Sequence, residues 1–281
     1  MIYLEYPKSS FVKDLCDYYN VDQEKAIALG TRSNGRRPDL PSSKTCSAVS
    51  GKTFEDIWDE KPRVCNADIF DFYRDQGAWS SFRQVIRHND LLGLHINLIK
   101  FLLHHTQSKN PVILEYGCGV APFSRTLVEF IEPSAEIDIY ISDVKDCEHF
   151  CFGEWRLSNK IKERELNVKV DACPITHDTL PVYDKKIDVV FIFEVLEHVP
   201  SPVECIKNIT NHLNDGALLV ENFIKHEDDH DQDGPDLSSA RLERDEYYRF
   251  LNNKFSLISG ETHLSSPNET RIWRKKVENL F

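Results

Sequence analysis

Short apolar runs alternate with amphipathic segments through the second half of the chain. The runs predict buried strands, and the stretches between them, with apolar residues three and four positions apart, predict helices. The predicted strands cover 111–116, 137–142, 167–171, 187–193, 217–224 and 254–260, with a last one near 270–275. The predicted helices lie at about 121–132, 146–164, 201–214 and 238–252. Alternation of this kind is typical of parallel βαβ units and predicts an α/β fold.

The first third of the chain follows a different pattern. Residues 1–66 show little periodicity and contain a turn-rich, positively charged stretch at 31–44. Two interpretations stay open for this region. It is an irregular appendage, or it is a flap on the substrate side in which Arg36 and Arg37 meet an anionic group.

Helical spacing begins at Asp68 and continues to His105, with Asn89 as a predicted cap between two helices. We therefore expect an N-terminal extension and helical cap over 1–105 and a main domain over 106–281. The aromatic residues of the cap, Trp79 and Phe82 among them, are expected to pack in a core or to close over a ligand.

Composition narrows the class of protein. A chain of 281 residues that is 41% hydrophobic has enough apolar residues for a sizeable core. Its net charge of −12 argues against a protein whose main task is to grip phosphate backbones. The eight cysteines form no Cys-x-x-Cys pair, and neither a signal-peptide pattern nor an apolar run of membrane length is present. These features predict reduced thiols in a cytoplasmic protein without a membrane segment.

The most informative motif follows the first predicted strand. The stretch 111–121 reads Pro-Val-Ile-Leu-Glu-Tyr-Gly-Cys-Gly-Val-Ala, so that Glu115 ends a buried strand and Gly117 and Gly119 form a tight turn before a helix. Glycines at such a turn let the chain reverse sharply and let a ligand approach the backbone.

Acidic residues recur at the ends of the next three predicted strands. Asp143 ends the second strand, and Asp171 with Ala172 follows the third. The fourth strand runs into a Glu-x-Leu-Glu-His segment that contains Glu194 and His198. The carboxyl ends of parallel strands are where open α/β folds bind ligands, which makes all of these positions candidate site residues.

This ordered set resembles the class I S-adenosylmethionine-dependent methyltransferases over roughly residues 86–262. The resemblance implies a seven-stranded, mostly parallel Rossmann-like methyltransferase sheet with an antiparallel terminal pair and an N-terminal helical cap. It also implies S-adenosyl-L-methionine as the cofactor. The family usually has a third glycine in the turn, and Ala121 stands there in this chain.

The resemblance assigns a role to each cofactor-binding position. Gly117 and Gly119 lie under the amino-acid end of the cofactor, and Glu115 orients the turn or receives the cofactor's ammonium group. Asp143 accepts hydrogen bonds from the ribose hydroxyls, with Asp146 as a less favoured substitute. The remaining positions are Asp171 and Ala172, which read the adenine, and Glu194, which lies near the sulfonium.

The implied reaction is methyl transfer to a small polar acceptor, expected to be a hydroxyl. Positioning provides much of the rate, and His226 is the first candidate base, with His198 in reserve. Two alternatives stay open. One is a metal-assisted RNA 2′-O-methyltransferase, in which Glu194, Glu197, His198 and His226 hold a divalent ion. The other is a cofactor-binding subunit without catalysis.

The segment 225–236 carries six acidic residues and two histidines after the fifth predicted strand. It is interpreted as a solvated acidic loop, a docking surface for a cationic substrate, or a metal site of oxygen ligands with one imidazole. The expected partner of the protein is a small-molecule substrate. Nucleic acid is the less favoured partner, and the sequence leaves the oligomeric state open.

Overall fold

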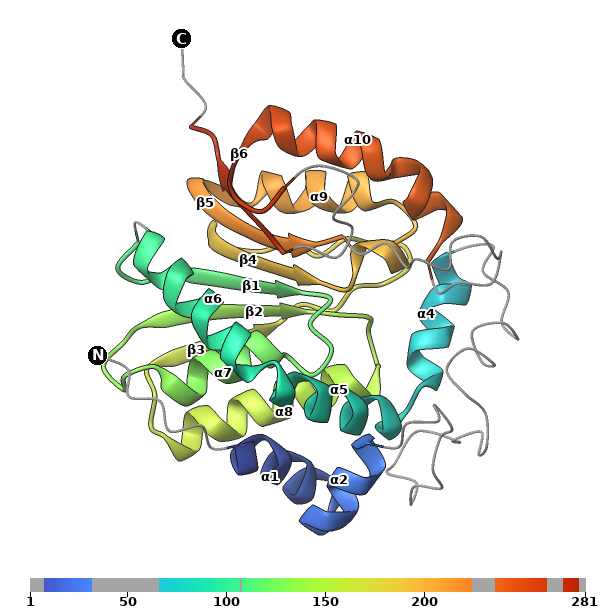
Figure 1. Cartoon of the computed structure of the whole chain (residues 1–281), viewed down its shortest axis with the longest axis vertical. Helices are drawn as coiled ribbons and strands as arrows, with labels where there is room; N and C mark the ends of the chain where they lie inside the picture. Colours follow the sequence, from blue (N-terminus) through green and yellow to red (C-terminus); the bar gives the residue numbers. More distant parts are fainter. Residues whose placement is uncertain (1–7, 32–65, 107, 224–235, 262–269, 278–281) are drawn as a thin grey trace.

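The structure, a computed structural model, describes residues 8–31, 66–106, 108–223, 236–261 and 270–277. Seven strands form one sheet in the order β3-β2-β1-β4-β5-β7-β6 (Figure 1). Strands β1 to β5 are parallel, and β7 inserts antiparallel between β5 and β6. The seven-stranded, mostly parallel α/β sheet predicted from the sequence, with its antiparallel terminal pair, is confirmed. The strands are β1 Val112–Tyr116, β2 Ile137–Ser142, β3 Val168–Ala172, β4 Ile187–Phe193, β5 Leu213–Asn222, β6 Phe255–Ser259 and β7 Arg271–Lys275.

The strand prediction worked because the inner strands are covered on both faces. All five residues of β1 are buried, so it appears in the sequence as a continuous apolar run rather than an alternating one. The start of β5 was wrong in the prediction, which gave Leu213 and Asn214 to the preceding helix. The strand already pairs at Leu213 and then shifts register before Leu218, with Gly216 at φ 78° between them. Because of this irregularity, the first residues of β5 do not show a strand pattern in the sequence.

Helices cover both faces of the sheet (Figure 1). One face packs against α6, α7 and α8, and the other packs against α9 and α10 with part of α4. The described helices are α1 Lys8–Tyr19, α2 Gln23–Thr31, α4 Asn66–Asp75, α5 Ala78–Asp90, α6 Leu92–His105, α7 Pro122–Phe130, α8 Glu148–Glu163, the 3-10 turn η1 Leu196–His198, α9 Pro202–Asn211 and α10 Ser238–Lys254. None of the helices in the described ranges is long and apolar enough to cross a membrane.

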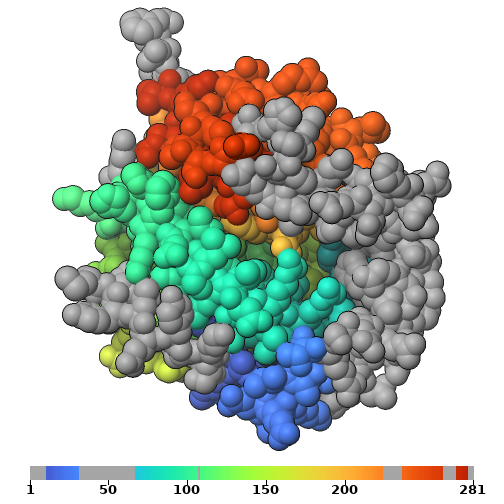
Figure 2. Space-filling model, viewed as in Figure 1, coloured from blue at the N-terminus to red at the C-terminus, as the bar shows by residue number. Residues whose placement is uncertain are grey.

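The N-terminal region is more regular than its sequence indicates. The expectation of an aperiodic stretch over 1–66 is wrong for α1 and α2, whose buried residues Phe11, Leu15 and Leu29 pack against Phe82 of α5. The two helices adjoin α5 and form a continuous surface with it (Figures 1 and 2). Arg36 and Arg37, the proposed substrate-side pair, lie outside the described residues.

The helical stretch before β1 contains three helices rather than the two expected. The chain breaks first at Gly77, which has φ 63°, and again at Leu91. Asn89, predicted to be a cap, lies inside α5. The break falls two residues later because the Leu91 amide closes the last turn of α5 on the carbonyl of His88.

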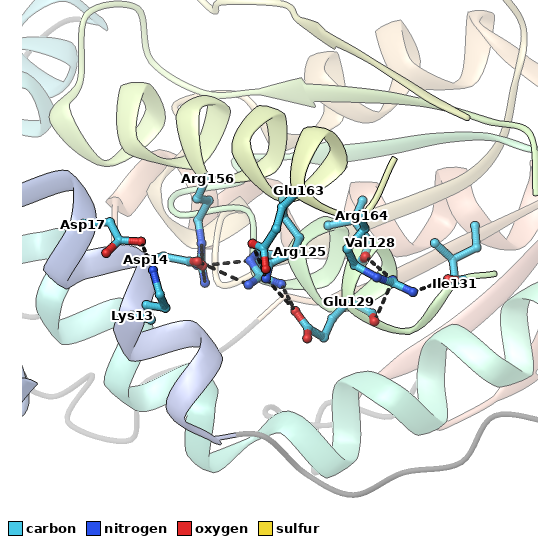
Figure 3. Close-up of polar contacts among 11 residues, drawn as sticks. Lys13, Asp14, Asp17, Arg125, Val128, Glu129, Ile131, Arg156, Glu163 and Arg164 are labelled. Atoms are coloured by element: carbon cyan, nitrogen blue, oxygen red, sulfur yellow. Dashed lines mark hydrogen bonds and ion pairs between the residues drawn. The ribbon is translucent and has the colours of Figure 1, made fainter. Parts of the chain in front are cut away.

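A buried ionic network ties α1 to the sheet-covering helices (Figure 3). Asp14 of α1 accepts hydrogen bonds from Arg125 Nε of α7 at 2.7 Å and from Arg156 Nε of α8 at 2.9 Å. Both guanidinium groups are almost fully buried, and Arg125 also donates to Glu129 at 2.6 Å. Arg156 additionally donates to the carbonyl of Val120 at 3.1 Å, which links the network to the loop after β1.

Candidate active site

A cavity of about 1370 Å³ opens at the carboxyl ends of β1, β2 and β4. Its walls come from the turn after β1, the end of β2, the segment 175–180, the end of β4 with η1, and the helices α4, α5 and α6. The strand order reverses between β1 and β4, and this switch point is where open α/β sheets bind ligands. The volume exceeds the usual range for one small ligand, roughly 300–1,000 Å³. A cofactor and an acceptor therefore have room side by side.

The turn after β1 is built around two glycines in the left-handed region. Gly117 has φ 63° and Gly119 has φ 52°. A Cβ at Gly117 would lie 2.3 Å from Val195 Cγ2, and one at Gly119 would lie 2.2 Å from Gln84 Oε1. At Gly117 a side chain would clash with the β-branched Val195, whereas at Gly119 the contacted atom is the flexible end of Gln84 and the positive φ is what favours glycine. The backbone of the turn thus forms a narrow cradle facing the cavity. Ala121, at the position of the family's third glycine, also has a positive φ of 50° and immediately precedes α7.

Glu115 caps the helix that follows the turn. Its carboxylate accepts hydrogen bonds from the amides of Phe123 at 3.1 Å and Ser124 at 2.8 Å, the first turn of α7. Burial raises the pKa of Glu115 to about 7, although the bonds from Ser124 and Phe123 oppose that rise. Of the two roles expected from the sequence, this geometry corresponds to orienting the loop.

Asp143 lies at the end of β2 and its carboxylate shapes the cradle. It accepts a hydrogen bond from the Gly119 amide at 2.6 Å and another from the Val144 amide at 2.6 Å. An ionised carboxylate has about four acceptor positions, so two remain for a ligand. The alternative, Asp146, is exposed and does not line the cavity.

Asp171 and Ala172 do not line the cavity. They belong to β3 itself rather than following it, and Asp171 forms an ion pair with the exposed Lys169. The chain continues past β3 and pairs Ile175 with Val144 in an isolated bridge. The bridge brings residues 175–180 to the cavity wall at the end of β2.

Glu194 lies at the mouth of the cavity with φ 54°. Its amide donates to Asn222 Oδ1 of β5 at 2.7 Å, and its carboxylate forms an ion pair with Arg87 of α5. The ion pair spans from the end of β4 to the helical cap, and the side chain of Glu194 remains 31% exposed. This carboxylate therefore joins two walls of the cavity.

His198 and Glu197 are neighbours in η1, and His198 Nε2 lies 3.9 Å from Glu197 Oε1. His198 lines the cavity beside the ring of Tyr73, whereas Glu197 is 1% exposed and does not line it. Burial raises the pKa of Glu197 well above its ordinary value. Within the described residues no cluster of three or more histidine, cysteine or acidic side chains forms a possible metal site. His226 and the acidic segment up to residue 235 lie outside the described part of the chain.

The helical cap supplies cavity residues that the sequence did not single out. Gln84 of α5 accepts a hydrogen bond from the Val120 amide at 3.2 Å, and Ser80 of α5 contacts His149 of α8 at the cavity wall. Trp79 lines the cavity as expected, but Phe82 faces α1 and α2 instead. No spacing in the sequence could show these contacts, because they join elements far apart in the chain.

Cys118, within the turn, does not have the properties of a nucleophile. The thiol is buried, and burial raises its pKa well above the ordinary value. A thiol in that state remains protonated and unreactive.

Residues 87–269 match the model of a family described as a methyltransferase domain. No curated protein matches the chain. Solved structures that resemble it include magnesium protoporphyrin IX methyltransferase from Synechocystis PCC 6803 with bound S-adenosylhomocysteine. That structure is 16% identical with a TM-score of 0.47, over 66% of this chain and 83% of the other.

Two further structures resemble the chain at similar levels. An S-adenosylmethionine-dependent methyltransferase from Aquifex aeolicus is 14% identical with a TM-score of 0.43, over 65% of this chain and 89% of the other. An rRNA methylase from Streptococcus thermophilus is 15% identical with a TM-score of 0.40, over 63% and 93%. The family match covers well over half of the chain, so this protein belongs to the class I S-adenosylmethionine-dependent methyltransferases and is an enzyme that uses that cofactor.

Proposed function

We propose that the enzyme transfers the methyl group to a hydroxyl of a small polar molecule bound in the cavity beside the cofactor. The observation that carries this proposal is the size and placement of the cavity, which extends from the glycine cradle to η1 and is walled by the helical cap. A cavity of this form suits an acceptor that is enclosed with the cofactor. The protein's charge of −12 favours such an acceptor over an extended polyanion.

The residues present fit the cofactor. Gly117 and Gly119 give its amino-acid end a backbone without side chains, and the N-terminus of α7 begins directly behind them. Asp143 retains acceptor positions for two ribose hydroxyls. The segment 175–180 lines the cavity where the adenine would lie, a role that the resemblance assigned to Asp171 and Ala172.

The cofactor, when bound, supplies an electrophilic methyl group on its sulfonium. The chain's own contribution is to align the acceptor, to exclude water and to receive a proton. We assign the last task to His198, whose side chain lines the cavity at the end of β4 and is 17% exposed. His226 remains the other candidate base from the sequence. Glu194 positions the cap over the acceptor through Arg87.

Methyl-labelled cofactor tests the acceptor class. The protein is incubated with it and with two fractions of a cell extract, metabolites below a few kilodaltons and total RNA. We expect label in the metabolite fraction. Label found in RNA alone would contradict the proposal and favour the RNA 2′-O-methyltransferase. A further loss of that labelling after chelation would show that the reaction needs a metal.

The proposed base makes a separate prediction. His198→Gln should lower turnover roughly 100-fold or more, the usual contribution of a positioned base, while S-adenosylhomocysteine still binds. His104→Gln, an exposed histidine of α6 outside the cavity, is the matched control. His226→Gln is measured alongside, and full activity in both variants would show that neither histidine is the base.

We also propose a cytoplasmic location. Six cysteines of the described part of the chain, on β-strand ends, helices and loops, are free thiols. Proteins that mature in oxidising compartments commonly pair such residues.

A further inference from the structure

Three side chains from separate elements form a buried hydrogen-bonded chain on the cavity wall. Ser80 of α5, His149 of α8 and Asp143 at the end of β2 are 3%, 3% and 7% exposed, and all three line the cavity. Ser80 Oγ lies 3.2 Å from His149 Nδ1, and His149 Nε2 lies 3.6 Å from Asp143 Oδ1. Ser80 and His149 are 69 residues apart in the chain, so no local sequence pattern indicates their contact.

Ser80 holds the His149 ring from one side. Its hydroxyl donates to the Gly77 carbonyl at 2.8 Å and lies within hydrogen-bond distance of Nδ1. Nε2, at the other end of the ring, faces Asp143 on the cavity wall. A ligand hydroxyl both donates and accepts, so it can bond to Nε2 in either tautomer.

The 3.6 Å between His149 Nε2 and Asp143 Oδ1 is longer than a direct hydrogen bond, so a ligand hydroxyl can contact both atoms. Asp143 already uses two acceptor positions on the Gly119 and Val144 amides. Its remaining acceptor positions and the Nε2 atom of His149 lie side by side at the cavity.

The geometry points to His149 as a second residue that binds the ribose diol, beside Asp143, with Ser80 as the residue that holds its ring. A vicinal diol offers two neighbouring hydroxyls, which matches the neighbouring Asp143 carboxylate and His149 Nε2. The inference rests on the proposed ribose role of Asp143. It adds a recognition residue that the strand-end motifs do not contain.

Calorimetric titration with three probes tests this assignment: S-adenosylhomocysteine and its 2′-deoxy and 3′-deoxy forms. Wild-type protein should bind at least one deoxy form about three- to tenfold more weakly than the parent compound, the value of one neutral hydrogen bond. In His149→Phe the affinity for the parent compound should fall by that factor, while the affinity for the same deoxy form should not change. The preference for the parent compound then disappears. His104→Phe, on the exposed end of α6, should keep the wild-type preferences.

An equal loss of affinity for all three probes in His149→Phe would overturn the assignment, because it would indicate a change in cavity shape alone. Unchanged affinities would overturn it as well. Ser80→Ala provides a milder variant if the buried phenylalanine prevents folding, and it should reduce the same preference in the same direction. If wild-type protein binds none of the probes, the cofactor site itself is wrong, which is a different result from an unaffected His149 variant.

Discussion

Replacement of Asp14 by alanine should destabilise the protein by about 3–5 kcal/mol, a large part of the stability of a typical domain. The carboxylate is shared by Arg125 and Arg156, whose side chains are 0% and 1% exposed. Without it, two buried guanidinium groups face each other, and Arg125 keeps its bond to Glu129 while Arg156 keeps its bond to the Val120 carbonyl. Uncompensated buried charge is among the most costly changes in a folded protein.

Urea unfolding of the purified variant measures this loss, and α1 offers a matched control. Asp17 lies three residues after Asp14 on the same helix, and its ion pair with Lys13 is exposed (Figure 3). Asp17→Ala should leave the unfolding free energy close to wild type, because exposed pairs contribute little. Equal losses in the two variants would contradict the structural account of the network.

The pH dependence of the network has a definite sign. Burial alone would raise the pKa of Asp14, but Arg156 and Arg125 together hold it below its ordinary value of 3.8. The stabilisation from the carboxylate is therefore fully present above pH 3.8 and is lost as the pH falls further. The difference in unfolding free energy between wild type and Asp14→Ala should shrink on strong acidification.

Gly117→Ala should weaken S-adenosylhomocysteine binding tenfold or more and cost about 1–2 kcal/mol of stability. The residue holds φ at 63°, where a side chain is strained by about that amount. In addition, the new Cβ would lie 2.3 and 2.6 Å from the two methyl groups of Val195. A β-branched side chain has little rotamer freedom, so the turn must move away from the position that fits the cofactor.

Gly216→Ala separates the two effects. Gly216 has φ 78° but lies in β5, outside the cavity. Its alanine variant should lose stability through backbone strain and bind S-adenosylhomocysteine as wild type does. Unchanged affinity in Gly117→Ala would show that the turn after β1 does not hold the cofactor.

The elements that could be predicted from the sequence are those whose burial or backbone conformation dictates the residue types of a short continuous segment. β1 and β4 are almost entirely buried and show as apolar runs, and the paired glycines of the turn after β1 are required by its backbone. The helices α1 and α2 were missed because each buries only a few residues, such as Leu15 and Leu29, against distant α5. Their regularity depends on that packing more than on their own pattern.

The same distinction holds for the residues around the cavity. The position of Asp143 at the cavity could be predicted because it follows a strand, and strand ends meet at one edge of a parallel sheet. Asp171 was assigned by the same rule, but β3 runs one residue past it and the chain reaches the cavity only from residue 175. Gln84 and His149 come from helices, and tertiary packing alone brings them to the glycine turn and to Asp143.

The affinity of Asp143→Asn for S-adenosylhomocysteine, measured by calorimetry beside Asp146→Asn, tests the central claim most directly. The claim is that the cofactor lies in the cavity at the ends of β1, β2 and β4 with its ribose on Asp143. We expect Asp143→Asn to weaken binding by about 1.5–3 kcal/mol, roughly 10- to 150-fold, and Asp146→Asn, exposed and at φ 64°, to bind as wild type does. Wild-type affinity in Asp143→Asn, or an equal loss in the Asp146 variant, would contradict the claim.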